Sequence, residues 1–223
     1  MTRDLVAEGM GTALLLYVIV GSGIAAESLS NDRAVQLLAH ALIVGMALGA
    51  LIDMLQSVAG SHFNPSVTLA FWRSGGIGFP EAVTYMPVQV IGAIAGAILA
   101  NVTFDLPAVS LSTTTRSGLG LVVAEAIATF VLVLIILSLV RSGRAGHVPA
   151  AVGAWVAAVV FATSSTGFAN PAVTVARMLT DSFTGIAPAS VTGFLSAQLV
   201  AGWSASLVAR SLNPEPVPNA AKT

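Results

Sequence analysis

The chain has 223 residues, of which 56% are hydrophobic and only 9% are charged. A soluble domain carries roughly 25% charged residues, so this composition excludes an ordinary soluble protein and indicates an integral membrane protein. A formal net charge of −1 argues against a nucleic-acid partner, and the lack of cysteine and the three isolated histidines argue against a disulfide framework or a metal site.

Six apolar stretches are long enough to span a bilayer, since a hydrocarbon core of about 30 Å needs about 20 helical residues. The first contains Glu8, has Arg3 as the only basic residue before it, and shows no clean small-residue cleavage pattern, so we interpret it as a retained helix rather than a cleaved signal peptide. The sequence therefore predicts an all-α membrane protein with six transmembrane helices, over residues 5–27, 34–58, 80–103, 118–141, 148–164 and 185–212.

Two short segments interrupt this pattern with nearly the same residues. SHFNPSVTLA runs from Ser61 to Ala70, between the second and third spans, and GFANPAVTVA runs from Gly167 to Ala176, between the fifth and sixth. Each is too short to cross a membrane and too apolar to lie in water, which predicts a re-entrant half-helix. Because lipid cannot satisfy non-helical backbone groups, we expect both segments to line a cavity within the protein.

The two halves of the chain repeat. Val-Ala-Glu-x-x-x-Thr occurs at Val6–Thr12 and at Val123–Thr129, and Gln89 and Gln198 occupy similar places in the third helix of each half. Three helices per half means that the second half enters the membrane from the opposite side, which is an inverted repeat. We expect one channel-like domain over residues 1–212, with repeats over 5–103 and 118–212, and a loose tail over 213–223.

Lysine and arginine predict the orientation. With both termini in the cytoplasm, six of these residues lie inside and three outside, as the positive-inside rule prefers. The inside set is Arg3, Arg73, Arg141, Arg144, Arg210 and Lys222, and the outside set is Arg33, Arg116 and Arg177.

The Asn-Pro pairs suggest what the half-helices do. Pro65 and Pro171 suit the first turn of a helix, and Asn64 and Asn170 suit the preceding cap position. Two half-helices that meet head to head would place two positive dipole ends at the bilayer centre. Such a centre opposes cations and protons but admits a neutral hydroxylated solute.

With its paired Asn-Pro boxes and an Ala-Glu in the first helix of each half, the chain resembles the major intrinsic protein family of aquaporins and aquaglyceroporins. The second box, Asn170-Pro171-Ala172, matches the family pattern in full, whereas the first has Ser66 in place of alanine. The resemblance implies that Glu8 and Glu125 accept hydrogen bonds from the re-entrant segments, with proton transfer as the alternative. It also implies a homotetramer in the lipid bilayer, with no cofactor and no enzymatic activity.

The outer constriction departs from water-selective members, which carry an arginine three residues after the second asparagine, where this chain has Val173. The other corresponding positions are Gly167, Val44 and, in the fifth helix, either Val160 or Ala158. Every candidate is small or aliphatic. The resemblance therefore implies a wide, apolar constriction that admits solutes larger than water.

Arg177 lies four residues beyond Val173, about one helical turn. We weigh two interpretations: a hydrated guanidinium at the outer mouth that repels cations without narrowing the pore, and an ion pair with Asp181. We expect His62 and His40 to be hydrogen-bonded or packed within the protein. Asp53 should face a polar cavity or a partner.

These features predict a passive channel for small neutral solutes in the inner (plasma) membrane. The pattern is similar to bacterial family members associated with arsenic resistance, so arsenite, As(OH)₃, is the first candidate, with glycerol, urea and water also possible. A water-selective aquaporin is the main alternative, and a secondary active transporter is the alternative from another class. A membrane hydrolase is remote, because adjacent Ser61 and His62 have no evident acid partner.

Overall fold

The computed structural model describes residues 2–217, which form eight α-helices and two short 3₁₀ helices. The elements are α1 (Thr2–Leu29), α2 (Arg33–Ala59), α3 (Pro65–Arg73), α4 (Phe79–Thr103), α5 (Leu119–Arg141), η1 (Ala145–His147), α6 (Val148–Ala162), α7 (Pro171–Ala176), η2 (Arg177–Leu179) and α8 (Pro188–Leu212). Six spans, counting η1 and α6 as one, are long and apolar enough to cross a membrane. The predicted all-α fold with six spans is confirmed, with small differences at the helix ends.

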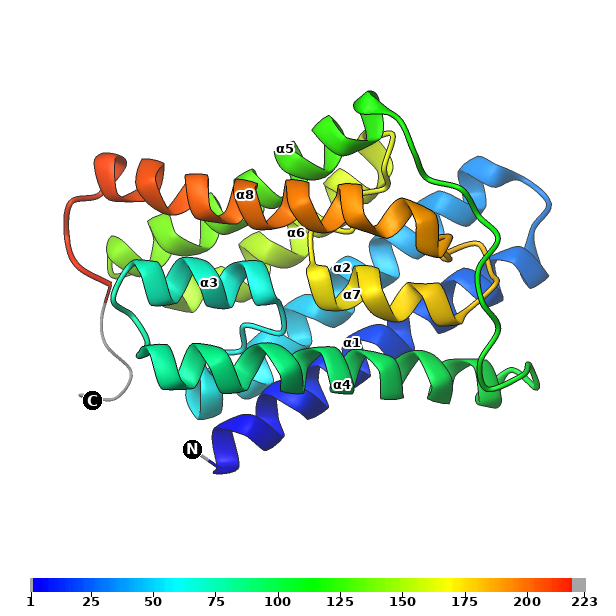
Figure 1. Ribbon diagram of the computed structural model, residues 1–223, viewed down its shortest axis with the longest axis horizontal. Coiled ribbons are helices and arrows are strands. Elements are labelled where there is room, and N and C mark those ends of the chain that lie inside the picture. Colours follow the sequence, from blue (N-terminus) through cyan, green and yellow to red (C-terminus); the bar gives the residue numbers. More distant parts are fainter. Residues whose placement is uncertain (1, 218–223) are drawn as a thin grey trace.

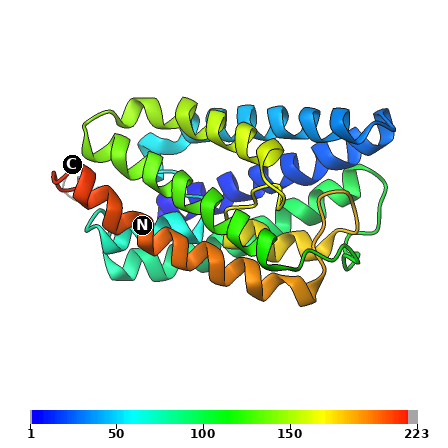
Figure 2. The ribbon, with the colours of Figure 1, turned by 90° about the horizontal axis from the view of Figure 1, so that it is seen from above.

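The long helices form two matching groups of three. In the first half α1 packs against α2 and α4, and in the second half α5 packs against α6 and α8. The groups join where α2 packs against α6, along one edge of the bundle in Figure 2. This is the arrangement that the three-helix repeat predicts.

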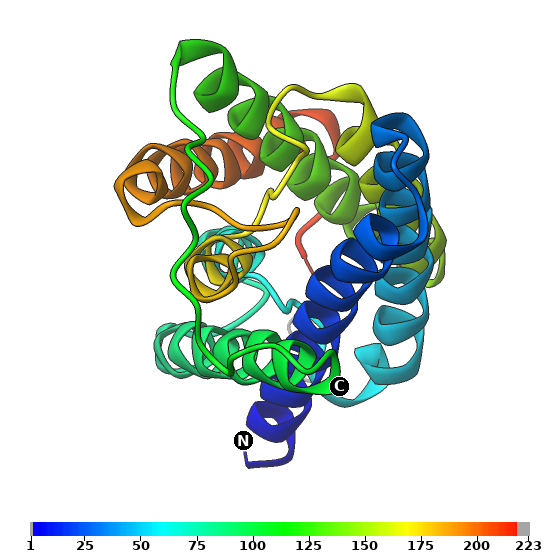
Figure 3. The ribbon, with the colours of Figure 1, turned by 90° about the vertical axis from the view of Figure 1, so that its right-hand side faces the viewer.

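The two half-helices α3 and α7 occupy the middle of the bundle, between α4 and α8 (Figure 1). Their proline-containing first turns face each other, and the view along the bundle shows one half-helix behind the other (Figure 3). Each cap asparagine has the same extended backbone: φ is −155° at Asn64 and −157° at Asn170. The two repeats thus build nearly identical helix starts that meet head to head.

Helix α6 is shorter than its counterpart α2. It has 15 residues, against 27 in α2, and the chain leaves it at Thr163 with φ −116° and ψ 147°. At 1.5 Å per residue, α6 alone reaches about 22 Å, less than the thickness of a hydrocarbon core. The segment 163–170 carries the chain onward to the second half-helix, and it supplies non-helical backbone to the interior of the protein.

Helices α1 and α4 approach closely because α4 has glycine at two contact positions. A Cβ atom added to Gly92 would lie 2.2 Å from the Gly9 carbonyl oxygen, and one added to Gly96 would lie 2.0 Å from the Ala13 carbonyl oxygen. Such distances leave no room for a side chain, so these glycines set the separation of the two helices.

The C-terminal segment differs from the expected loose tail in its described part, residues 213–217. The Arg141 side chain donates from Nε to the Asn213 carbonyl at 2.6 Å and from Nη2 to the Pro214 carbonyl at 3.3 Å. Val217 is 5% exposed and lies against Gly76. Polar, Pro-rich composition therefore misled the prediction here, because a buried arginine binds the carbonyl groups of this segment. Residues 218–223 lie outside the described residues.

Candidate functional site

The two Asn-Pro boxes bind each other at the centre of the protein. Asn64 Nδ2 donates to the Ala169 carbonyl, and Asn170 Nδ2 donates to the Phe63 carbonyl, each at 2.8 Å. The side-chain oxygens cap their own half-helices, accepting from the amides of Ser66 and Ala172 at 2.9 Å. A side-chain amide has two N–H groups, so each asparagine retains one donor.

Ser66, the departure in the first box, does not add a hydroxyl to the interior space. Its side chain is fully buried, and its Oγ donates to the Gln198 carbonyl of α8 at 3.1 Å. Ala172, at the matching place in the second box, is also fully buried. Serine thus replaces alanine here with its extra polar atom satisfied within the protein.

The backbone just before each box is left-handed. The φ angles are 51° at Ser61 and 48° at Phe63, and 52° at Gly167 and 50° at Ala169. Residues other than glycine rarely adopt this conformation, which persists only where surrounding contacts hold it. The matching pattern in both halves therefore calls for matching contacts to hold the backbone.

Glu8 supplies those contacts in the first half. Its carboxylate accepts from the His62 and Phe63 amides and from Gln89 Nε2, all at 2.8 Å. The side chain is fully buried and does not line the central cavity described below. Glu8 therefore acts as a fixed acceptor for the re-entrant backbone.

Glu125 does the same in the second half. It accepts from the Phe168 and Ala169 amides at 2.8 and 2.9 Å and from Gln198 Nε2 at 2.6 Å. These are the contacts that the family resemblance implies for both glutamates. Because every bonding partner is an N–H donor, the geometry favours the structural role over proton transfer.

A central cavity of about 70 Å³ runs past the two boxes, with Asn64 and Asn170 in its wall. Since one water needs about 10–15 Å³ of such space, it holds only a few molecules at a time. Its walls include two stripes of residues spaced four apart on two facing helices. They are His40, Val44, Leu48 and Ile52 on α2, and Val148, Val152, Val156 and Val160 on α6, and all of these except His40 are aliphatic.

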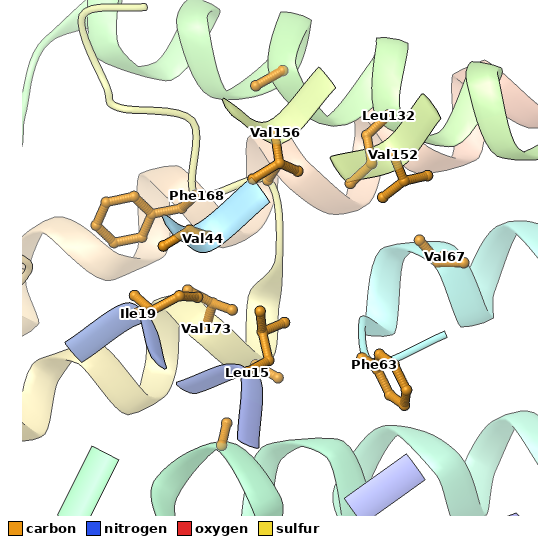
Figure 4. Close-up of a cluster of buried hydrophobic side chains, with 14 of the residues drawn as sticks. Leu15, Ile19, Val44, Phe63, Val67, Leu132, Val152, Val156, Phe168 and Val173 are labelled. Atoms are coloured by element: carbon orange, nitrogen blue, oxygen red, sulfur yellow. The ribbon is translucent and has the colours of Figure 1, made fainter. Parts of the chain in front are cut away.

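Figure 4 shows part of this lining, with Ile19 of α1, Val44 of α2, Val156 of α6 and Val173 of α7 converging from four elements. The four residues assigned to the constriction, Val44, Val160, Gly167 and Val173, all line this one cavity. Ala158, the alternative in the fifth helix, is exposed instead. The four residues thus share one cavity, and of the two fifth-helix alternatives only Val160 lines it.

Arg177 is largely buried and makes no ion pair with Asp181. The side chain is only 4% exposed, its Nε donates to the Thr184 carbonyl, and its guanidinium carbon lies 3.4 Å from the centroid of the Phe168 ring. Asp181 instead accepts from the Thr113 amide at 2.9 Å, and no ion pair joins it to Arg177 in the described chain. Arg177 is therefore neither freely hydrated nor paired with Asp181, because the loop 182–185 and an aromatic ring cover it.

A second, wider cavity of about 710 Å³ lies outside the first and carries most of the charged groups near the site. Glu27, Arg33, Arg116 and Asp181 line it. His40, Thr166 and Arg177 line both cavities, so they mark the place where the two meet.

The sequence interpretation of His40 as a packing residue missed its position in both cavity walls. The available signal was its spacing: it lies four residues before Val44, on the same face of α2.

Of the other two polar residues singled out, His62 lines the central cavity and Asp53 does not. His62 is buried at the first box, with Nδ1 3.1 Å from Thr68 Oγ1 and its ring 4.5 Å from that of Phe71. Asp53 is exposed, accepts from Gln56 Nε2 at 3.3 Å, and borders a groove between α2 and α6 on the outside of the bundle. Within residues 2–217, no three His, Asp or Glu side chains gather in a way that could hold a metal ion.

Comparison with known proteins agrees with this architecture. A family model described as Major intrinsic protein matches residues 1–169. Aquaglyceroporin AqpS of Rhizobium meliloti is 42% identical over 200 residues, which cover 90% of this chain and 85% of that protein. Probable aquaporin AqpM of Archaeoglobus fulgidus is 28% identical over 94% of this chain and 98% of its own length. The X-ray structure of the aquaglyceroporin from Plasmodium falciparum superposes with a TM-score of 0.73 at 18% identity, covering 95% of this chain, and so shares the fold.

Proposed function

The chain belongs to the major intrinsic protein family, and we propose that it is a channel for small uncharged solutes. Arsenite, As(OH)₃, is the first candidate, and glycerol, urea and water are further solutes. That it is a passive channel for small solutes, and not an enzyme, follows from the family. The finer choice rests mainly on one observation: valine and glycine line the cavity where a narrowing arginine would stand in water-selective members.

The two helix ends at the centre of the pathway are the feature expected to exclude ions. The starts of α3 and α7 meet there, and each helix N-terminus carries roughly half a positive charge. A cation would meet both positive ends while surrounded by aliphatic side chains that cannot replace its water. A neutral solute can instead exchange water for the free amide N–H groups of Asn64 and Asn170.

A water-selective channel is the second candidate, and one observation favours it. Arg177 lines the central cavity, so a residue with a cationic side chain does border the pathway, although one helical turn from the expected place. The 42% identical relative from Rhizobium meliloti is an aquaglyceroporin, which supports the wider channel.

Stopped-flow measurements on proteoliposomes test this choice. Vesicles containing the protein are mixed with excess glycerol, arsenite or an impermeant sugar, and light scattering follows the volume change. We expect faster glycerol and arsenite entry than in empty vesicles, in addition to faster water flux. Faster water flux with glycerol and arsenite entry unchanged from empty vesicles would establish the water-selective alternative.

We also propose that the protein is a homotetramer in the inner membrane, with both termini in the cytoplasm. Arg33, Arg116 and Arg177 line one cavity together and so lie on one side of the bundle, and the positive-inside rule favours this smaller set on the outside. Reporter fusions to the two ends test the orientation, since both should be active only on the cytoplasmic side. Cross-linking in membranes tests the assembly.

A further inference from the structure

Three polar residues stand where the wide outer cavity meets the central one. His40 comes from α2, Thr166 from the non-helical segment 163–170, and Arg177 from η2. No other residue lines both cavities. These three side chains therefore border the place where the two cavities meet.

Arg177 is held so that its end remains available. Its Nε donates to the Thr184 carbonyl, and its guanidinium lies over the Phe168 ring. Its two terminal nitrogens, Nη1 and Nη2, have no hydrogen-bond partner in the described chain. Neither of these atoms is fully buried. They are therefore open to the space that Arg177 lines, and they can donate to a solute there.

The surrounding loop fixes this arrangement. The Glu27 carboxylate accepts from the Phe183 amide at 2.9 Å, and Arg116 donates to the carbonyl groups of Phe183 and Gly185 at 3.2 and 2.8 Å. These bonds hold the residues on both sides of Thr184, which binds Arg177. The donor is thus pre-organised, which reduces the entropy lost when a solute binds.

His40 is held in a similar way from the opposite helix. It is 3% exposed, its Nδ1 lies 2.8 Å from Ser22 Oγ, and its ring meets the Phe183 ring edge-on at 5.9 Å. Its other ring nitrogen, Nε2, has no hydrogen-bond partner in the described chain and is not fully buried. One imidazole nitrogen therefore remains for a solute.

These groups lie one helical turn outside the aliphatic positions. His40 precedes Val44 by four residues on α2, and Arg177 follows Val173 by four residues, each a rise of about 6 Å. The pathway thus has two successive layers: a polar one formed by His40, Thr166 and Arg177, and an aliphatic one beneath it.

We propose that His40, Thr166 and Arg177 form the outer selectivity filter of this channel and recognise neutral solutes that carry two or more hydroxyl groups. This inference deepens the proposed function and rests on it. One hydroxyl accepts from the Arg177 terminal N–H groups while another bonds His40 Nε2 or the Thr166 hydroxyl. A solute with a single polar group can satisfy only one side. The bonds replace water that the solute loses before it enters the aliphatic layer.

The ratio of glycerol to water permeability tests this filter. We expect Arg177→Ala and His40→Ala each to change the ratio by about threefold or more, since one net hydrogen bond corresponds to a factor of roughly 2 to 12. Arg33→Ala is the matched control, because it removes a charge from an exposed residue of the outer cavity that does not line the junction. Its ratio should stay within about twofold of the wild type. Unchanged ratios in both filter variants would overturn the proposal.

Thiol labelling gives a second test, which does not depend on the folding of an arginine variant or on glycerol transport. The natural chain has no cysteine, so a single introduced one is the only target. We expect a bulky charged methanethiosulfonate reagent to block water flux through Thr166→Cys. Leu111→Cys, in an exposed loop, should react without loss of flux. Complete labelling of Thr166→Cys with full water flux would refute the position of the filter.

Glycerol flux in the wild type separates the two proposals. If the wild type conducts water but no glycerol, the proposed solute range fails, while a block of Thr166→Cys would still place the constriction at this layer. If glycerol flux is high and Thr166→Cys labelling has no effect, the filter proposal fails and the proposed function stands.

Discussion

Glu8→Gln tests whether the buried glutamates hold the re-entrant backbone. Glutamine has nearly the same shape, but it replaces one carboxylate oxygen with an NH₂ group that cannot accept. Of the three donors that Glu8 binds, the amides of His62 and Phe63 and the side chain of Gln89, at least one loses its acceptor and faces another donor. The remaining bonds also lose the charge that strengthens them.

The size of the effect follows from these contacts. Hydrogen bonds to charged groups contribute about 1.5–3 kcal/mol each, so losing or weakening two of them costs roughly 3–6 kcal/mol. Glu81→Gln is a suitable control, because Glu81 makes one exposed bond, to the Gly78 amide at 2.9 Å. Glutamine can still accept this exposed bond through its amide oxygen, so the control should lose about 0.5 kcal/mol or less.

Thermal unfolding of the purified protein in detergent, together with water flux per channel, measures both consequences. We expect the melting temperature of Glu8→Gln to fall several times further than that of Glu81→Gln, with reduced flux. A stability equal to that of the control would refute the structural role. If that variant also lost a proton current present in the wild type, Glu8 would be a proton-transfer group instead.

Three further substitutions test other parts of the structure. Asn64→Asp and Asn170→Asp each place a carboxylate at the meeting helix ends and remove the Nδ2 donor to the opposite box. We therefore expect cation currents in liposomes or loss of expression. Normal solute flux with full ion exclusion in both variants would contradict this. Val173→Arg adds a long side chain to the central cavity, so glycerol and arsenite flux should fall much more than water flux, and an equal fall for all three would place the constriction elsewhere. Gly96→Ala puts a Cβ atom 2.0 Å from a carbonyl oxygen of α1, so it should sharply lower the yield of folded protein. Gly120→Ala is the control, because Gly120 has open space around it, and its yield should not fall. Equal yields would show that α1 and α4 can separate.

Much of the fold could be predicted because bilayer thickness leaves few choices. The six spans follow from apolar length alone, and the repeated Asn-Pro segments reveal both the half-helices and the inverted repeat. The head-to-head meeting of Asn64 and Asn170 also follows from the repeat, since two matching segments that enter from opposite sides start at the same depth.

The outer part of the site was harder to predict because it depends on contacts distant in sequence. The position of Arg177 is set by Thr184 and Phe168, and no local pattern places either beside it. The role of His40 depends on the shape of two cavities: its spacing from Val44 places it on the same face of α2, but does not show that a second cavity meets the first there. Likewise, the bonds from Arg141 to Asn213 and Pro214 join segments about 70 residues apart.

The central claim, that neutral solutes cross passively, is tested most directly by glycerol flux through the wild-type protein over a wide concentration range. The flux is measured in proteoliposomes with and without imposed proton and sodium gradients. A passive channel predicts flux that rises in proportion to the glycerol gradient, does not saturate, and is the same with or without the ion gradients. Saturation together with accumulation driven by an ion gradient would contradict this account and indicate alternating-access transport.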